Sequence, residues 1–172
     1  MKSRFLFLLA GISFMLTAAA QSDTVRFDRF SVVFPAKPTS VGLGTNMRHQ
    51  LRLADSSAIF QALQIDMSDQ GMDEATVLMM QAEPAFWEQT RDGIVAQLGG
   101  DTKLIKDEML DWKGTKIMQM HLERPSKEGG VNKLTLRMLF LGTHMIQYGH
   151  TNRNDKADAA LRDAFLASLQ IK

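Results

Sequence analysis

Residues 131–141 constrain the fold of this chain most strongly, because apolar side chains fill both faces of the segment. In an extended conformation alternate residues point to opposite sides. One side carries Leu134, Leu136, Met138 and Phe140, and the other carries Leu139 and Leu141. A strand that is apolar on both sides is typical of a sheet with a covering layer on each face. The segment therefore predicts a central strand in a sheet that is covered on both faces near its centre.

Alternating patterns predict further strands along the chain. Residues 24–34 are expected to form two short strands around Asp28, which Pro35 and Pro38 close because proline cannot donate to a strand ladder. The other segments with strand-like patterns are 46–54, 57–67, 101–110, 115–123 and 143–151. Short turns separate most of these segments, and short turns join antiparallel neighbours. The sequence therefore predicts an antiparallel sheet.

Two regions show helical spacing instead. Residues 73–98 predict two helices, with Asp73 as the N-cap of the first and Pro84 in the first turn of the second. The apolar stripe of the second helix is Trp87, Ile94, Val95 and Leu98. A last helix is expected after Asn154 or Asp155, with an apolar face made of Ala157, Ala160, Leu161, Ala164, Phe165, Ser168 and Leu169. We therefore expect an α+β fold, an antiparallel β-sheet flanked by helices on both faces (an α/β/α sandwich), as a single domain over residues 21–172.

Residues 1–20 have the pattern of a signal peptide. Lys2 and Arg4 precede an apolar run from Phe5 to Leu16, and residues 18–20 are three alanines that fit a cleavage site. The run is shorter than the roughly 20 residues that a membrane-spanning helix needs. An uncleaved anchor is the alternative interpretation. The pattern predicts a periplasmic or secreted protein with no membrane span after cleavage.

Charge and cysteine content exclude several classes of protein. The chain of 172 residues holds 20 Lys and Arg, 19 Asp and Glu, and no Cys. A nucleic-acid binder usually shows a basic excess, so no nucleic-acid partner is expected. The lack of Cys excludes a disulfide scaffold, a thiol nucleophile and a Cys-ligated zinc site.

Three segments spread along the chain share the pattern of one known family. They are FDRFSVVFPAKP (27–38), KLTLRMLFLGTHMIQYGHT (133–151) and AALRDAFLASLQI (159–171). In their order and spacing they resemble the PsbP/DcrB-like superfamily. The resemblance implies an antiparallel sheet between helices, in agreement with the strand and helix patterns. It also implies a mostly non-enzymatic role, with no family catalytic residue to transfer, and nothing in this chain is specific to the photosystem role of some members.

Two candidate metal sites are weak in the sequence. Residues 66–77 place Gly71 at the sixth position of a calcium loop, but Val77 stands where the loop needs Glu, so a turn capped by Asp73 is the better interpretation. Met and His residues could bind copper, but Met118 and Met120 face away from His121 on one strand. His144 and His150 lie six residues apart, too far to share an ion from one strand. No metal or cofactor is expected, although ligands from different strands could still converge.

Enzymatic chemistry has no support in the sequence motifs. The chain lacks G-x-S-x-G, H-E-x-x-H and a phosphate-binding glycine loop. We therefore expect no catalytic residues and a protein that is not an enzyme.

Other conspicuous residues favour structural roles. His49 lies on an apolar face and is expected to be a core or boundary histidine held by one hydrogen bond rather than a ligand. If residues 142–143 form a two-residue turn, Arg137 lies directly opposite Tyr148, and we expect a structural clasp with the guanidinium over the ring. The alternative for Arg137 is an anion-binding corner.

Two functions remain open at this point. The first is an exported, non-enzymatic accessory or protein-binding domain of the periplasm, with another envelope protein as its partner. Its contact surface could be a sheet face or the charged connection 123–133. The second is a module that binds a small ligand or lipid in a cleft lined by Phe86, Trp87 and Trp112, although these three side chains fit a core equally well.

Overall fold

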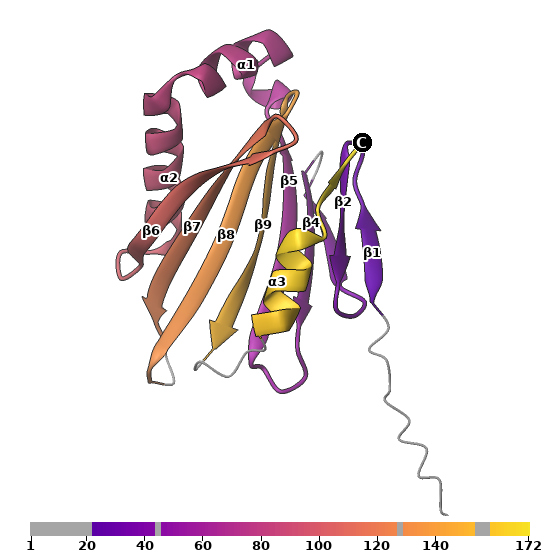
Figure 1. The fold of residues 1–172 in the computed structure, drawn as a ribbon, viewed down its shortest axis with the longest axis vertical. Coiled ribbons are helices and arrows are strands. Elements are labelled where there is room, and N and C mark those ends of the chain that lie inside the picture. The colour runs from indigo at the N-terminus through magenta and orange to yellow at the C-terminus, as the bar shows by residue number, and fades with distance from the viewer. Residues whose placement is uncertain (1–21, 44–45, 127–128, 154–158) are drawn as a thin grey trace, which may run out of the picture.

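A computed structural model describes residues 22–43, 46–126, 129–153 and 159–172 of the chain. The expected signal peptide lies outside the described residues. The described part is an α+β domain with a large antiparallel sheet and three α-helices (Figure 1). No helix within these ranges has the length and hydropathy that crossing a membrane requires.

Seven antiparallel strands form the main sheet, in the order β3-β4-β5-β9-β8-β7-β6. Their bounds are β3 (Thr39–Leu43), β4 (Asn46–Arg52), β5 (Ala58–Asp66), β6 (Lys103–Trp112), β7 (Thr115–Pro125), β8 (Val131–Leu141) and β9 (His144–Arg153). The predicted register of β8 and β9 is confirmed, because Leu141 pairs with His144 and Arg137 pairs with Tyr148. The sequence analysis missed β3, where the alternation is limited to Val41 and Leu43 around a glycine, and placed β6 two residues too early at its start.

The first two strands belong to a second, smaller sheet. This sheet has the order β1-β2-β10, with β1 (Asp23–Arg26), β2 (Phe30–Phe34) and β10 (Gln170–Ile171). The expectation of one sheet was therefore wrong for the N-terminal strands. The strands themselves were predicted, but β10 is two residues long and too short to give a pattern of its own.

Two helices, α1 (Glu74–Ala82) and α2 (Pro84–Leu98), meet at a sharp elbow. Asp73 caps α1 as expected, since its Oδ1 accepts a hydrogen bond of 2.7 Å from the Thr76 backbone N–H. Glu83 is extended (φ −88°, ψ 122°), and Pro84 starts α2 at a position where a missing N–H costs nothing. The indole Nε1 of Trp87 donates to the Gln81 carbonyl at 2.9 Å, which ties the two helices across the elbow.

The last helix, α3 (Ala159–Ala167), begins after residues 154–158, so the expected caps Asn154 and Asp155 lie outside the described residues. Its predicted face is confirmed in part. Phe165 and Leu169 are buried and Leu161 and Ser168 partly buried, but Ala160 and Ala164 are exposed, the unpredicted Leu166 is buried, and Ala157 lies outside the described residues. Leu and Phe bury far more apolar area than Ala, so the large side chains decide which face turns inward.

Buried side chains form two separate clusters, and β8 contributes to both. Leu139 belongs to the first cluster, with Phe30, Phe60, Tyr148 and Phe165 among its other members. Leu134, Leu136, Met138 and Phe140 belong to the second, together with Val77, Trp87 and Ile94 of α1 and α2. Neighbouring residues of β8 thus pack into different clusters, as the apolar pattern on both of its sides predicted.

A titratable group is buried on the face of the sheet that carries the first cluster. His150 on β9 is 4% exposed, and its ring lies 4.9 Å from that of Phe60. Its Nε2 has no hydrogen-bond partner among the described residues. Burial, together with the charge of Arg162, lowers the pKa of His150 from 6.5 to about 4, and Asp163 opposes this shift. The folded protein therefore holds this imidazole neutral at pH values where the unfolded chain protonates it.

Acid should destabilise the protein through His150. The unfolded chain takes up a proton near pH 6.5, whereas the folded protein does so only near pH 4, so the free energy of unfolding falls as pH drops through this window. The expected loss at pH 5 is about 2 kcal/mol relative to pH 7.5. Urea denaturation of the wild type and of His150→Gln at several pH values measures it. The variant should lose this part of the pH dependence, and equal slopes between pH 7.5 and 5 would show that His150 has no such role.

Candidate functional site

Two hollows on the surface lie along the α1–α2 elbow. Two adjoining pockets of about 490 Å³ each share Gln81, Ala82 and Lys116 in their linings. We call the two together the elbow groove. It runs from the β8–β9 turn, past the end of α1, to the space between α2 and the edge strand β6.

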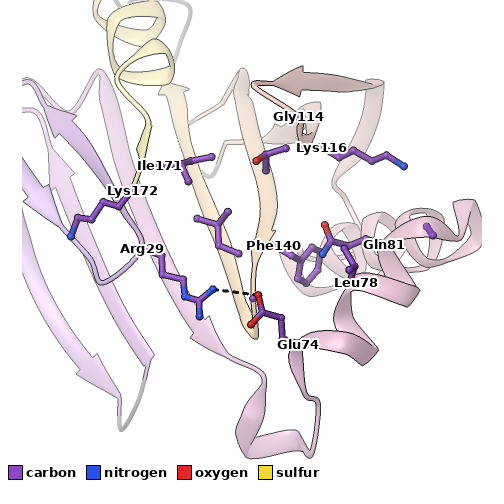
Figure 2. Close-up of a pocket in the computed structure, with 13 residues that line it drawn as sticks. Arg29, Glu74, Leu78, Gln81, Gly114, Lys116, Phe140, Ile171 and Lys172 are labelled. Atoms are coloured by element: carbon purple, nitrogen blue, oxygen red, sulfur yellow. Dashed lines mark ion pairs between the residues drawn. The ribbon is translucent and has the colours of Figure 1, made fainter.

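The first pocket combines an apolar floor with a charged mouth (Figure 2). Leu78, Phe140 and Ile171 supply apolar surface. Figure 2 shows Arg29 reaching toward Glu74, and their closest atoms, Nη1 and Oε1, are 3.6 Å apart. Both side chains are about half or more exposed, so this ion pair adds little stability and can open to admit a ligand. The pocket can thus take an apolar group through a polar mouth.

Gly142 lets Arg29 lie close to the β8–β9 turn at this mouth. Its φ of +59° lies in the left-handed region, which favours glycine. A Cβ at this position would also collide with the Arg29 guanidinium. The turn residue therefore sets the position of the charged side chain.

The second pocket lies between α2 and β6. Trp87 and Met118 line it from the second buried cluster, and Met109 on the edge strand is 47% exposed. At one side Arg91 of α2 donates to Asp107 of β6, with Nη1 and Oδ2 3.3 Å apart. The hydrogen bonds to Asp92 and Asp107 raise the pKa of Arg91. This contact fixes the width of the pocket by holding the helix against the strand.

Charges around the elbow groove are balanced. The basic residues of the two linings are Arg29, Arg91, Lys116 and Lys172, and the acidic residues are Glu74, Glu88, Asp107 and Asp111. The Lys172 ammonium is turned to the β1–β2 connection, where it donates to the Phe27 carbonyl at 2.7 Å. A rim of both signs around apolar surface resembles a protein interface more than a surface for a polyanion.

The cleft expected from the aromatic residues is present only in part. Trp87 lines the second pocket, whereas Phe86 packs between Trp87 and Phe140 in the core. Trp112 packs against the first cluster, with the Lys113 Nζ 5.9 Å from its ring centre. Sequence reasoning missed Leu78 and Lys116. One signal for Leu78 was available in the sequence: residues 78 and 79 are two large apolar residues next to each other on a short helix. Neighbouring residues of a helix point in different directions, so at most one of the two can point directly at the core.

Arg137 forms a clasp, as expected, but with a different geometry. Its Nη1 donates to the Leu166 carbonyl at 2.7 Å and to the Tyr148 hydroxyl at 3.4 Å. Its Nε donates to Gln119 Oε1 at 2.7 Å. The guanidinium thus meets the hydroxyl and the end of α3 rather than lying over the ring. Burial raises the pKa of Tyr148, although Arg137 opposes this rise.

Candidate metal ligands do not converge in the described part of the chain. No group of three or more His, Asp or Glu there could hold an ion. Met118 and Met120 are buried in the second cluster, and His144 lies with its Nε2 3.9 Å from Asp66 Oδ2. The calcium-like segment 66–77 is a strand end, a 3₁₀ turn (Ser68–Gln70) and the capped start of α1, as the better interpretation predicted.

His49 and the connection 123–133 also have clear places. The His49 Nδ1 is 2.7 Å from the Ser40 hydroxyl, and the ring meets the edge of Phe27, so it is the half-buried, hydrogen-bonded histidine that the pattern predicted. Burial lowers the pKa of His49. The connection takes up only part of this segment, because β7 continues to Pro125, while β8 starts at Val131 as predicted.

Comparison with known structures identifies the fold. The solution structure of cyanobacterial PsbP from Synechocystis sp. PCC 6803 matches 97% of this chain and 99% of its own, with 13% sequence identity and a TM-score of 0.57. The fold is PsbP-like. The PsbP/DcrB-like resemblance of the three sequence segments is confirmed at the level of the fold. No protein-family model and no curated protein matches the sequence.

Two more distant structures support no inference, because their TM-scores are below 0.5. A Bacteroides thetaiotaomicron protein matches 83% of this chain with 9% identity and a TM-score of 0.47, and this chain spans only 45% of it. LpqN of Mycobacterium tuberculosis, described as involved in cell envelope biogenesis, matches 88% of this chain and 83% of its own with 12% identity and a TM-score of 0.43.

Replacing Arg137 should destabilise the protein. Arg137→Met removes two charge-assisted hydrogen bonds, so the Gln119 Oε1 loses its donor and the Leu166 carbonyl keeps only the longer bond from the Tyr148 hydroxyl. We expect the free energy of unfolding to fall by about 2–4 kcal/mol. Urea denaturation followed by circular dichroism measures the change. The control Arg26→Met, at an exposed position of β1, should stay within about 0.5 kcal/mol of the wild type. Unchanged stability in Arg137→Met would instead favour the anion-binding interpretation of this residue.

Proposed function

We propose that this protein is an exported, non-enzymatic binding domain of the cell envelope, and that its elbow groove docks a segment of another envelope protein. The observation that carries the proposal is the apolar surface of α1 beside the groove. Leu78 is 67% exposed and Met79 is 73% exposed. Leu78 lies against the pocket that Phe140 and Ile171 line, so exposed and half-enclosed apolar surface are continuous.

The rim supports a protein as the occupant. Interfaces between proteins combine an apolar centre with a polar edge, and the groove has charges of both signs around its apolar floor. Lys116 lies where the two pockets meet, so it can pair with an acidic group of a chain that crosses both. Export is supported by the signal-peptide pattern of residues 1–20.

The proposed architecture around this site is the α/β/α sandwich. Two observations support it: α1 and α2 contribute to the second buried cluster, and α3 contributes to the first. Alternate residues of β8 point into the two clusters, and alternate residues of a strand lie on opposite faces. In this arrangement the groove lies between the layer formed by α1 and α2 and the edge strand β6 of the sheet.

A small apolar ligand is the second candidate function, and the second pocket favours it. Its volume of about 490 Å³ falls within the range of roughly 300–1,000 Å³ that is typical of ligand sites. Trp87, Met109 and Met118 provide an aromatic and thioether lining that adapts to apolar shapes.

Site-specific photo-cross-linking in the producing cells tests the docking proposal. A benzophenone side chain at position 78 should give one reproducible protein adduct. The same group at position 41, where Val41 is 51% exposed on the edge strand β3, should not. Charge reversal at Lys116, inside the groove, should lower the yield several-fold, because rim charges steer association. Reversal at Lys103, at the start of the same edge strand β6 as the groove but outside its lining, should leave the yield unchanged. No adduct at position 78, or equal adducts at both positions, would contradict the proposal.

Native mass spectrometry tests the ligand candidate. If the second pocket holds a small apolar molecule, freshly purified protein should carry an added mass of a few hundred daltons that denaturation releases. Met109→Lys should abolish this added mass, since it brings a charge into the apolar lining. The control Ile105→Lys changes an exposed residue of the same strand that does not line the pocket, so the added mass should persist. A bare mass in every wild-type preparation would exclude this function.

A further inference from the structure

A second site lies at the opposite end of the main sheet, away from the elbow groove. A pocket of about 740 Å³ opens where α2 ends and where β7, β8 and β9 have their far ends. Asn132 lines this pocket, while Gly142 lines the elbow groove, and the two are ten residues apart on one strand and its turn. This separation is about 33 Å along the sheet. None of the residues that line this pocket lines the elbow groove.

Strand register gathers three arginines at this pocket. Arg52 pairs with Ile59, and Ile59 pairs with Thr151. Arg124 and Arg153 both pair with Asn132, one from each neighbouring strand. Directly opposed residues of antiparallel strands share a face, so these side chains project from one side of the sheet. This side of the sheet is the one that α2 covers. Thr151 also pairs with Leu134, and Leu134 packs in the second cluster together with residues of α2.

The charge of the pocket is strongly one-sided, in contrast to the chain as a whole. Among the residues that the structure describes, its lining contains the three arginines and one acidic residue, Asp101. The whole chain is nearly neutral, with a formal charge of +1. Arg124 is held in place, because its Nη1 donates to the Leu98 carbonyl at the end of α2 at 3.4 Å. A guanidinium has five N–H donors in a planar fork, which matches the geometry of carboxylates and phosphates.

A buried acceptor atom in the same pocket lacks a hydrogen-bond donor among the described residues. Asn132 is 8% exposed, and its Oδ1 has no hydrogen-bond partner in the part of the chain that the structure describes. An amide oxygen accepts hydrogen bonds, and leaving it unpaired inside the protein costs free energy. A ligand hydroxyl could supply the missing donor. A carboxylate or a sulfate alone has no proton to donate to it.

We propose that this pocket binds an anionic sugar, in which a phosphate or carboxylate meets the arginines and a hydroxyl donates to Asn132. The volume supports more than a bare anion, since an inorganic phosphate would leave most of 740 Å³ empty. The hydroxyl of Thr151 and the backbone of Gly99 and Gly100 line the remaining wall, and both suit the polar edge of a sugar ring. This site is independent of the docking function of the elbow groove.

Calorimetric titration of the full chain at low salt and without phosphate buffer tests the proposal. The probes are glucose 6-phosphate, glucuronate, inorganic phosphate and glucose. At least one of the two anionic sugars should bind at least tenfold more tightly than inorganic phosphate, and glucose should give no heat. Equal affinity for phosphate and for both anionic sugars would overturn the proposal, because the hydroxyl contact would then contribute nothing. The absence of binding by both anionic sugars would overturn it as well.

Matched variants test which residues bind the anionic group and which residue accepts the hydrogen bond from the sugar hydroxyl. Arg52→Gln should weaken the anionic sugar at least tenfold, whereas Arg48→Gln, on the same strand and face but outside the pocket, should leave it unchanged. Asn132→Ala should remove the advantage of the anionic sugar over inorganic phosphate without weakening inorganic phosphate itself. Thermal melting of each variant confirms that it is folded. If Arg52→Gln binds the anionic sugar as tightly as the wild type, the pocket is not the site.

Discussion

The contact between Arg137 and the end of α3 holds the two ends of the described chain in one structure. Glu108, Gln119, Arg137 and Tyr148 lie directly opposite one another on β6, β7, β8 and β9, so they form one row across the sheet. Hydrogen bonds run along the row: the Gln119 Nε2 donates to Glu108 Oε1 at 2.8 Å, the Arg137 Nε donates to Gln119 Oε1 at 2.7 Å, and the Arg137 Nη1 donates to the Leu166 carbonyl. A helix end has unpaired carbonyls, and a guanidinium is well suited to satisfy one. With α3 fixed, Ser168 meets the backbone of β2 and β10 completes the small sheet, so the N-terminal strands also depend on this clasp.

The two proposed binding surfaces lie at the periphery of the sheet, away from the row of polar side chains in its middle. The elbow groove forms where α1 turns into α2, and the basic pocket forms where α2 ends. Both therefore depend on the placement of α2, which Arg91 holds against β6 at the middle of the helix and Arg124 holds against β7 at its C-terminal end. The strands supply a rigid base. Many of the residues that line the two sites lie at strand ends and in turns. This division is typical of proteins in which the scaffold positions side chains and the loops carry recognition.

The sequence predicted the parts of this structure that rest on local periodicity. The strands of the main sheet other than β3, the capped start of α1, the break at Pro84 and the pairing of Arg137 with Tyr148 all follow from alternation, capping and turn length. The separate small sheet could not be predicted, because β10 is two residues long and its pairing with β2 joins segments 139 positions apart. The pocket with the three arginines was missed for a related reason. Arg52, Arg124 and Arg153 are ordinary surface residues in the sequence, and only the register of five strands shows that they share a face.

The two sites should behave as independent units in spite of their common helix. Effects of substitutions usually add when the residues are more than roughly 7–10 Å apart and share no partner. The elbow groove and the basic pocket share no lining residue, and the length of β8 lies between them. Coupling would require α2 to have two stable positions, but Trp87 and Ile94 are buried in the second cluster, Arg91 holds the middle of the helix and Arg124 holds its C-terminal end. Without an element that has two positions, neither site can bias the other. A partner at the elbow and an anionic sugar at the far end of the sheet would therefore bind without influencing each other's affinity, and the domain would join them by holding both on one rigid sheet.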